Sequence, residues 1–262
     1  MRDIFNELSE AMSDPDPIKR AQIQMRRPLP KRFYQAVTVE AFQDGHRMLL
    51  DGKPVRTPAR HHLVFPAASL ATASAAEWEA QGETIDPARM PLTRLANTAL
   101  DGVASDMQSV REDVLRFAAT DLLCYRAPGP DRLVEAQTKH WDPILDWASS
   151  TLAARFALAE GVMHVAQPRE AISALSVHLG AIDEPFRLTA LHLATSLTGS
   201  ALIAFALSKG AINPDGAWKA AHVDEDWNAE LWGEDSEAIE RRRLRRIDFD
   251  VACRVLETDG AR

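Results

Sequence analysis

The sequence predicts an α+β protein in which a small β-rich N-terminal domain precedes a larger α-helical C-terminal domain. Three observations lead to this prediction. Apolar and polar residues alternate over 37–40, which is the period of a half-buried strand. Two turn signals, Asp44-Gly45 and Asp51-Gly52, separate short apolar runs, as in β-hairpins. From Pro66 onward the apolar residues recur at helical spacing.

The strands are expected within residues 32–66. Runs at 48–50 and 61–65 supply neighbours for the strand at 37–40, while Pro54 and Pro58 indicate sheet edges or bends. Residues 1–31 form an arm, in which a short apolar stripe precedes prolines that keep the chain extended. The stripe consists of Ile4, Leu8 and Met12.

Helical periodicity covers most of the remaining chain. The expected helices lie at about 66–80, 91–103, 109–125, 134–159, 168–179, 184–207, 217–231 and 236–257. The domain boundary falls between residues 85 and 130. We divide the chain into an arm at 1–31, a β-rich domain with helices at 32–120 and an α-helical domain at 121–262.

Composition narrows the class of protein. The chain has 262 residues and a net charge of −8, so bulk electrostatics favours neither nucleic acid nor anionic lipid as a partner. The most apolar stretch, 188–207, contains several polar residues and is typical of a buried helix rather than a membrane span. Two distant cysteines, Cys124 and Cys253, suggest no disulfide framework and fit a reducing cytoplasm.

Motifs for catalysis are missing from the sequence. It contains no Gly-x-Ser-x-Gly nucleophile motif, no phosphate-binding loop and no dinucleotide fingerprint. His61 and His62 are adjacent on an expected strand and point to opposite faces, which disfavours a shared metal ion. We therefore expect no catalytic residues, no cofactor and no bound metal.

One segment near the C-terminus combines acids with tryptophans. Asp224, Glu225 and Asp226 lie near Asp235 and Glu237, a pattern that fits either a divalent-cation site or a solvated helix face. Trp218, Trp227 and Trp232 fall in the same short window. Aromatic side chains beside charges are typical of protein-binding patches, although each indole could equally pack in the core.

Several ordered motifs together resemble the family of ATP synthase assembly chaperones found in mitochondria and α-proteobacteria. They are Arg32-Phe33-Tyr34, the run from Leu50 to Pro58, Glu77 to Gly82, Ile85-Asp86-Pro87, Met90 to Ala99, Thr120 to Arg126, Gln137 with Trp141-Asp142-Pro143, and Trp218 to Trp227 followed by Trp232-Gly233. The resemblance runs from about residue 32 to residue 256. It implies the α+β fold above and a mitochondrial-matrix location for eukaryotic relatives.

The implied function is that of a non-catalytic chaperone. It would bind the free α subunit of F-type ATP synthase and prevent its aggregation until the β subunit replaces it. We expect a monomer. One alternative is a hydrolase or metalloenzyme that uses the acids at 224–240, and another is a structural subunit that stays in the finished complex.

The candidate partner-binding residues lie in the C-terminal segment. They are Trp218, Asp224, Glu225, Trp227, Trp232, Glu237 and Glu240. An apolar stripe at Leu244, Ile247, Val251 and Val255 is expected to be buried, which places Glu240 one turn earlier at its edge. The resemblance also points to a functionally sensitive glutamate in this segment. An ordinary pairing of Glu240 with Arg243 is the simpler alternative.

Overall fold

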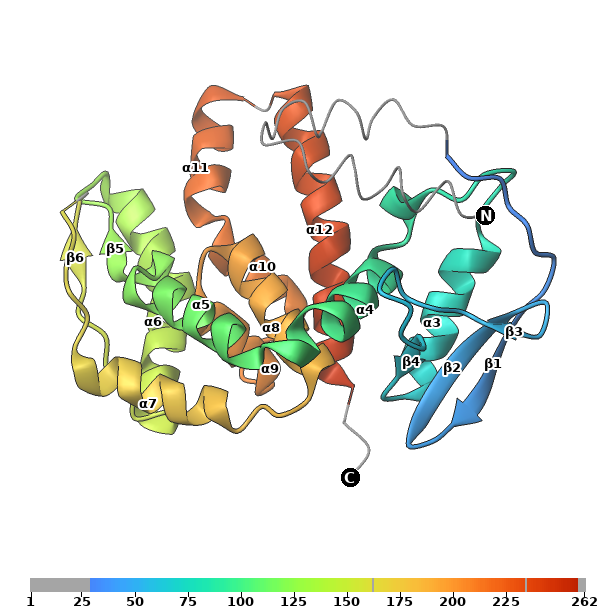
Figure 1. The fold of residues 1–262 in the computed structure, drawn as a ribbon. Helices are drawn as coiled ribbons and strands as arrows, with labels where there is room; N and C mark the ends of the chain where they lie inside the picture. The colour runs from blue at the N-terminus through green and yellow to red at the C-terminus, as the bar shows by residue number, and fades with distance from the viewer. Residues whose placement is uncertain (1–28, 162, 234, 259–262) are drawn as a thin grey trace, which may run out of the picture.

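A computed structural model describes residues 29–161, 163–233 and 235–258. The apolar stripe expected at Ile4, Leu8 and Met12 lies outside them. Four short strands and one helix form a small unit at one side of the molecule, and the remaining helices form the larger part (Figure 1). The α+β prediction is confirmed.

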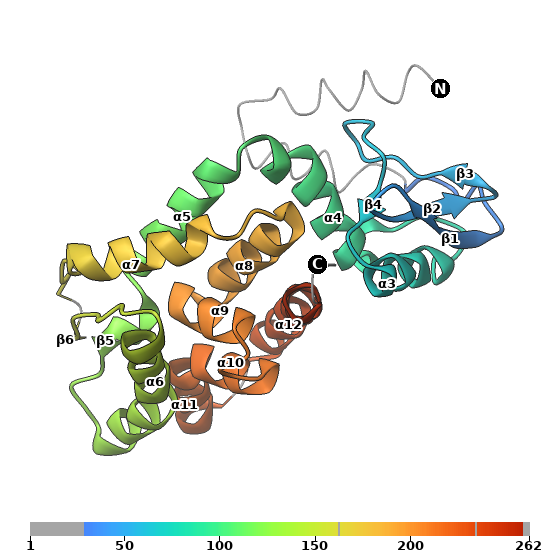
Figure 2. The same ribbon diagram turned by 90° about the horizontal axis from the view of Figure 1, so that it is seen from below.

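The β-sheet is built around its second strand. Strand β2 (Gly45–Leu50) pairs antiparallel with β1 (Val37–Phe42), β3 (Lys53–Pro54) and β4 (Val64–Phe65). Helix α3 (Ala68–Glu79) covers one face, where the alternate side chains of β2 are buried. Figure 2 shows this helix lying along the sheet.

The first hairpin is displaced by one residue from the predicted turn. Phe42 pairs with Gly45, so the turn residues are Gln43 and Asp44 and the glycine begins β2. A Cβ atom at position 45 would lie 2.6 Å from the carbonyl oxygen of Phe65. The glycine is therefore required by the close approach of β4 rather than by the turn itself.

Over the residues that the structure describes, the helical part contains nine α-helices. They are α4 (Pro91–Asp101), α5 (Met107–Ala119), α6 (Asp131–Thr151), α7 (Arg169–Gly180), α8 (Pro185–Thr198), α9 (Ala201–Ser208), α10 (Pro214–Ala221), α11 (Val223–Trp232) and α12 (Ser236–Glu257) among the described residues. A small parallel pair, β5 (Tyr125–Arg126) and β6 (Ala159–Glu160), joins the loops on either side of α6. Every residue of α9 is buried, so this helix marks the centre of the helical core.

The single helix predicted at 184–207 is wrong. The helix ends at Gly199, which has a left-handed φ of 69° and forms the C-cap of α8. The buried carboxylate of Asp121 then accepts hydrogen bonds from the Ser200 hydroxyl at 2.6 Å and from the Leu202 amide at 3.0 Å. These bonds pair polar groups in the first turn of α9. The interruption between α8 and α9 therefore leaves few buried amide N–H groups without a hydrogen bond.

Two further predicted helices end or divide earlier than expected. The helix predicted at 109–125 ends at Ala119, after which Asp121 caps a short 3₁₀ turn at Leu122–Cys124. The helix predicted at 217–231 divides into α10 and α11 at His222. The Nδ1 atom of His222 lies 2.7 Å from the carbonyl oxygen of Trp218. At this junction the imidazole therefore supplies the hydrogen bond to that carbonyl that a backbone N–H supplies within a helix.

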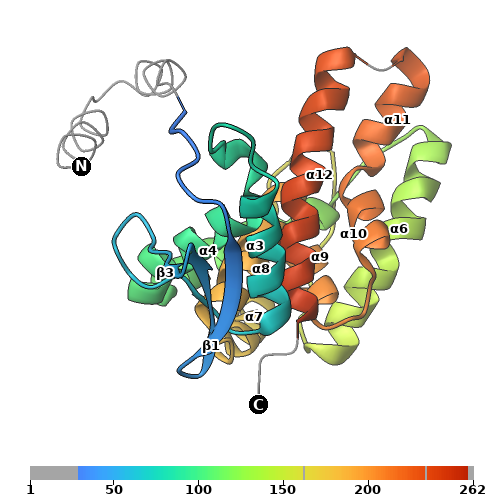
Figure 3. The same cartoon turned by 90° about the vertical axis from the view of Figure 1, so that its right-hand side faces the viewer.

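Helix α12 is half exposed and half buried. Its C-terminal half packs on α8, α9 and α4, while its N-terminal end extends beyond the body of the molecule (Figure 3). The expectation that Leu244 and Ile247 are buried is wrong, since they are 49% and 39% exposed. The buried stripe is instead made by Phe249, Ala252, Cys253, Val255 and Leu256. Periodicity identified the helix but not how much of its length meets the core.

The β-rich and helical parts meet along α4 and α8. Helices α4 and α5 both pack on α8, and Arg94 of α4 forms an ion pair with Asp248 of α12 at 2.6 Å. The buried apolar side chains on either side of residue 120 belong to one continuous cluster. The division of the chain at residue 120 stays a prediction.

Candidate functional site

The ends of α11 and α12 project together at one end of the molecule. Figures 1 and 3 show the two helices rising side by side away from the sheet and from α7. Within α11, Val223 at the first position is the buried residue. The projecting end therefore contributes little to the core, which is typical of a segment kept for contact with a partner.

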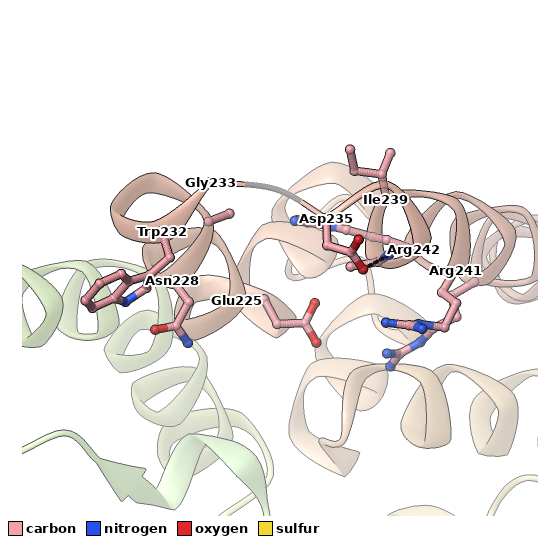
Figure 4. Close-up of a pocket in the computed structure, with 11 residues that line it drawn as sticks. Glu225, Asn228, Trp232, Gly233, Asp235, Ile239, Arg241 and Arg242 are labelled. Atoms are coloured by element: carbon pink, nitrogen blue, oxygen red, sulfur yellow. Dashed lines mark hydrogen bonds between the residues drawn. The ribbon is translucent and has the colours of Figure 1, made fainter.

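A groove separates the two helices at this end. Its volume is about 410 Å³, and its walls include Glu225 and Trp232 from α11 and Ile239 and the arginines of α12 (Figure 4). The Trp232 side chain lies at the rim and is 84% exposed. The lining arginines are Arg241, Arg242 and Arg245. The groove thus combines an apolar rim with a cationic wall.

Ion pairs hold α12 at a fixed distance from its neighbours. Arg242 pairs with Asp226 of α11 at 2.6 Å, which spans the groove. Arg246 pairs with Asp215 of α10 at 2.6 Å and with Asp250 at 2.7 Å. These pairs are partly exposed, so each adds little to stability, but together they link α12 to α10 and α11.

The opposite side of α12 carries a second exposed surface, which we call the outward face: Glu240, Arg243, Leu244 and Ile247. Positions 240, 243, 244 and 247 follow the spacing that places side chains on one side of a helix. Arg243 donates to both oxygens of Glu240, each at 2.8 Å. This hydrogen bonding holds the pKa of Glu240 below its usual value. The outward face therefore places an ordered ion pair beside two exposed aliphatic side chains.

The remaining predicted residues fall in other surroundings. Trp218 is 7% exposed, and its ring stacks on His222 with centroids 4.0 Å apart. Asp224 accepts a hydrogen bond from Gln137 at 2.7 Å, and Arg132 lies 5.4 Å from the Trp227 ring, so both residues face α6.

Glu237 is exposed and lies 3.3 Å from Arg241. Of the seven predicted residues, Glu225 and Trp232 meet in the groove and Glu240 lies on the outward face.

Sequence reasoning missed the arginines and the aliphatic residues of α12. Arg241, Arg242 and Arg245 were not among the candidate residues, and Leu244 and Ile247 were assigned to the core. A usable signal was present, since the Arg-rich run from 241 to 246 leaves few positions for a helix to bury. Such a composition favours a projecting helix.

The acids at 224–226 do not converge. Asp224 faces Gln137, Glu225 lies 3.7 Å from His222, and Asp226 pairs with Arg242. Among the described residues, no group of three or more His, Cys, Asp and Glu side chains is arranged to hold a metal ion.

The two adjacent histidines are also separated. His61 lies 2.9 Å from the carboxylate of Asp101, and the ring of His62 packs against Phe42. Over the residues that the structure describes, no helix combines the length and the apolar character needed to cross a membrane.

Comparison with known proteins identifies the family. The family model for the ATP12 chaperone protein matches residues 31–149. The solved structure of Atp12 from Paracoccus denitrificans is 38% identical, covers 87% of this chain and 97% of its own, and superposes with a TM-score of 0.80. The chain belongs to the ATP12 chaperone family. This is a family of ATP synthase assembly chaperones.

Two more relatives extend the match. A candidate chaperone of Agrobacterium tumefaciens is 58% identical, with 98% of this chain and 96% of its own covered and a TM-score of 0.85. The mitochondrial atp12 protein of Schizosaccharomyces pombe is 23% identical over 237 residues, which is 83% of this chain and 81% of the relative. The ATP12 family model ends within α6, whereas the Agrobacterium structure matches nearly the whole chain, including α11 and α12.

Proposed function

We propose that this chain is a non-catalytic chaperone of ATP synthase assembly that binds the free α subunit, its client. The proposal is supported by membership of the ATP12 family and by the chemistry of the projecting α11–α12 end. The protein acts as a monomer in the bacterial cytoplasm, and the β subunit releases the client by competing for the same surface.

The outward face of α12 is the observation that carries the proposal. Leu244 and Ile247 expose aliphatic surface on a helix that is otherwise rich in arginine. The Glu240–Arg243 pair lies beside them. Apolar side chains around an ordered charge pair are typical of the centre of a protein-binding surface. An unassembled subunit exposes apolar surface that aggregates, and covering that surface is what a holding chaperone must do.

Refolding of the α subunit tests the proposal. Light scattering from diluted, denatured α subunit should fall when this protein is present in equimolar amount, and the two should elute together from a sizing column. Addition of β subunit should then move the α subunit out of the complex. Unchanged scattering together with separate elution would reject the α subunit as the client.

A further inference from the structure

The groove between α11 and α12 brings together an exposed apolar pair, Trp232 and Ile239, and a guanidinium, that of Arg245. The indole of Trp232 is 84% exposed at the end of α11, and Ile239 on the facing helix is 48% exposed. Figure 4 shows Trp232 on α11, with its ring turned away from α12, and Ile239 on α12 with its side chain pointing outward at the mouth of the groove. Large apolar side chains at the rim of a concave surface are the usual anchors of a protein contact.

Arg245 supplies the second group. The other arginines of the run 241–246 each pair with a carboxylate, but Arg245 does not do so within the described residues. Its guanidinium donates a hydrogen bond to the carbonyl oxygen of Leu197 on α8, at 2.6 Å. A guanidinium has five N–H donors, so one bond holds Arg245 in position and leaves most of its donors for a ligand.

The opposite wall carries the opposite charge. Glu225 on α11 is 57% exposed at its side chain, and the nearest basic atom that it meets is Nε2 of His222 at 3.7 Å. Burial lowers the pKa of His222, so the imidazole is neutral near pH 7 and does not compensate the carboxylate. The groove is therefore polarised, negative along α11 and positive along α12.

We propose that this groove binds a client segment in which a large apolar side chain is next to a carboxylate. The apolar side chain packs between Trp232 and Ile239, and the carboxylate accepts hydrogen bonds from Arg245. Glu225 repels a second carboxylate and accepts amide N–H groups, which fixes the direction of the bound segment. The inference rests on the proposed function only for the identity of the client; the chemistry of the groove is tested separately.

The probe is a set of three blocked peptides: acetyl-Gly-Leu-Glu-Gly-amide and its Leu-Gln and Ala-Glu counterparts. Binding to the full chain is followed by NMR through the indole N–H resonance of Trp232, assigned by its loss in Trp232→Phe. The Leu-Glu peptide should shift this resonance saturably. Each counterpart should bind roughly tenfold more weakly, because it lacks either the charge-assisted hydrogen bond or the apolar contact. Equal affinities for the three peptides would overturn the proposal.

Matched variants assign the selectivity to Arg245. Arg245→Gln should bind the Leu-Glu and Leu-Gln peptides equally, whereas Arg245→Lys should recover part of the preference. Arg254→Gln is the control, since Arg254 is an exposed arginine near the other end of α12. A preference for Leu-Glu that survives Arg245→Gln would contradict the assignment. If Arg245→Gln unfolds, the Lys variant decides the question.

The full client separates this proposal from the proposed function. Trp232→Ala should weaken binding of the α subunit several-fold, while Val177→Ala, which trims an exposed apolar side chain on α7, should not. Selective peptide binding without any binding of the α subunit would reject the α subunit as the client, while the proposed selectivity of the groove would stand. If the Trp232 resonance instead shifts on dilution of the free protein, the occupant is a second copy of this chain and the proposal is wrong.

Discussion

Glu240 and Arg243 form a two-point ion pair on the outward face of α12, with both N–O distances at 2.8 Å. Both side chains are more than half exposed, so the pair adds little to the stability of the folded chain. Its geometry is nevertheless fixed, because a guanidinium fork and a carboxylate match in two hydrogen bonds. An ordered ion pair that adds little to folding stability and lies beside exposed aliphatic residues fits a role in binding.

Reversal of the charge at position 240 should separate binding from folding. Glu240→Lys places a cation beside Arg243 and removes the acceptor, so we expect the affinity for the α subunit to fall about tenfold or more. The thermal midpoint should change by only a few degrees, since the site is exposed. Titration calorimetry and a thermal melt measure the two effects. Glu257→Lys, at an exposed site near the other end of the helix, is the control; normal binding by Glu240→Lys would remove this residue from the surface.

The aliphatic residues of the outward face should behave in the same way. Leu244→Ser with Ile247→Ser removes exposed apolar surface, so unfolding free energy should change by less than about 1 kcal/mol while client affinity drops. Phe249→Ala, two residues further along the helix, removes a fully buried ring and should cost about 3–5 kcal/mol. Urea unfolding measures both. A large loss of stability in the double variant would mean that these residues support the fold.

The sequence predicted the fold class and most of the helices because periodicity and turn residues are local signals. The last helix was predicted at 236–257, and α12 has these bounds. The break at Gly199 was not predictable in the same way, since Asp121, which satisfies the following turn, lies 79 residues from Ser200. A buried carboxylate that is contributed by a distant loop does not change the local periodicity of apolar residues, so that periodicity cannot reveal it.

The candidate site was predicted in part. Clustering of tryptophans and acids indicated the projecting α11–α12 end of the molecule, and Glu225, Trp232 and Glu240 all lie there. Trp218 lies in the core instead, because α10 packs against α12 and Phe249 meets its ring. Composition cannot distinguish an indole in the core from one at a rim, since the difference depends on which helices project.

The buried carboxylate of Asp121 should make stability depend on pH. Burial raises the pKa of Asp121 to about 6, although hydrogen bonds from Ser200 and Leu202 partly offset this. The folded chain therefore holds this proton more tightly than the unfolded chain, whose Asp pKa is about 3.9. The resulting stabilisation is complete below about pH 4 and is lost as the pH rises through about 6.

Asp121→Asn removes this titration and so provides the measurement. The unfolding free energy of the unsubstituted chain should gain about 1 kcal/mol over that of Asp121→Asn when the pH falls from 7 to 5. At pH 7 the variant itself should be about 1–3 kcal/mol less stable, because an amide cannot accept all the bonds that the carboxylate accepts. A difference that stays constant between pH 7 and pH 5 would show that Asp121 does not titrate there.

The two cysteines should be unreactive in the folded protein. Burial raises the pKa of Cys124 and of Cys253 to about 12, and a thiol rather than a thiolate is a poor nucleophile. Reaction with an aromatic disulfide reagent at pH 8 should therefore be slow in buffer and rapid in denaturant. Fast labelling of either thiol without denaturant would place that residue at the surface.

The central claim is that this chain holds the free α subunit through the α11–α12 end. Sizing chromatography with light-scattering detection tests it most directly, using α subunit mixed with the unsubstituted chain or with Glu240→Lys. We predict one complex of defined mass with the unsubstituted chain, little or none with the variant, and release of the α subunit when β subunit is added. Separate elution of the α subunit and the unsubstituted chain, or a complex of equal strength with the variant, would contradict the account.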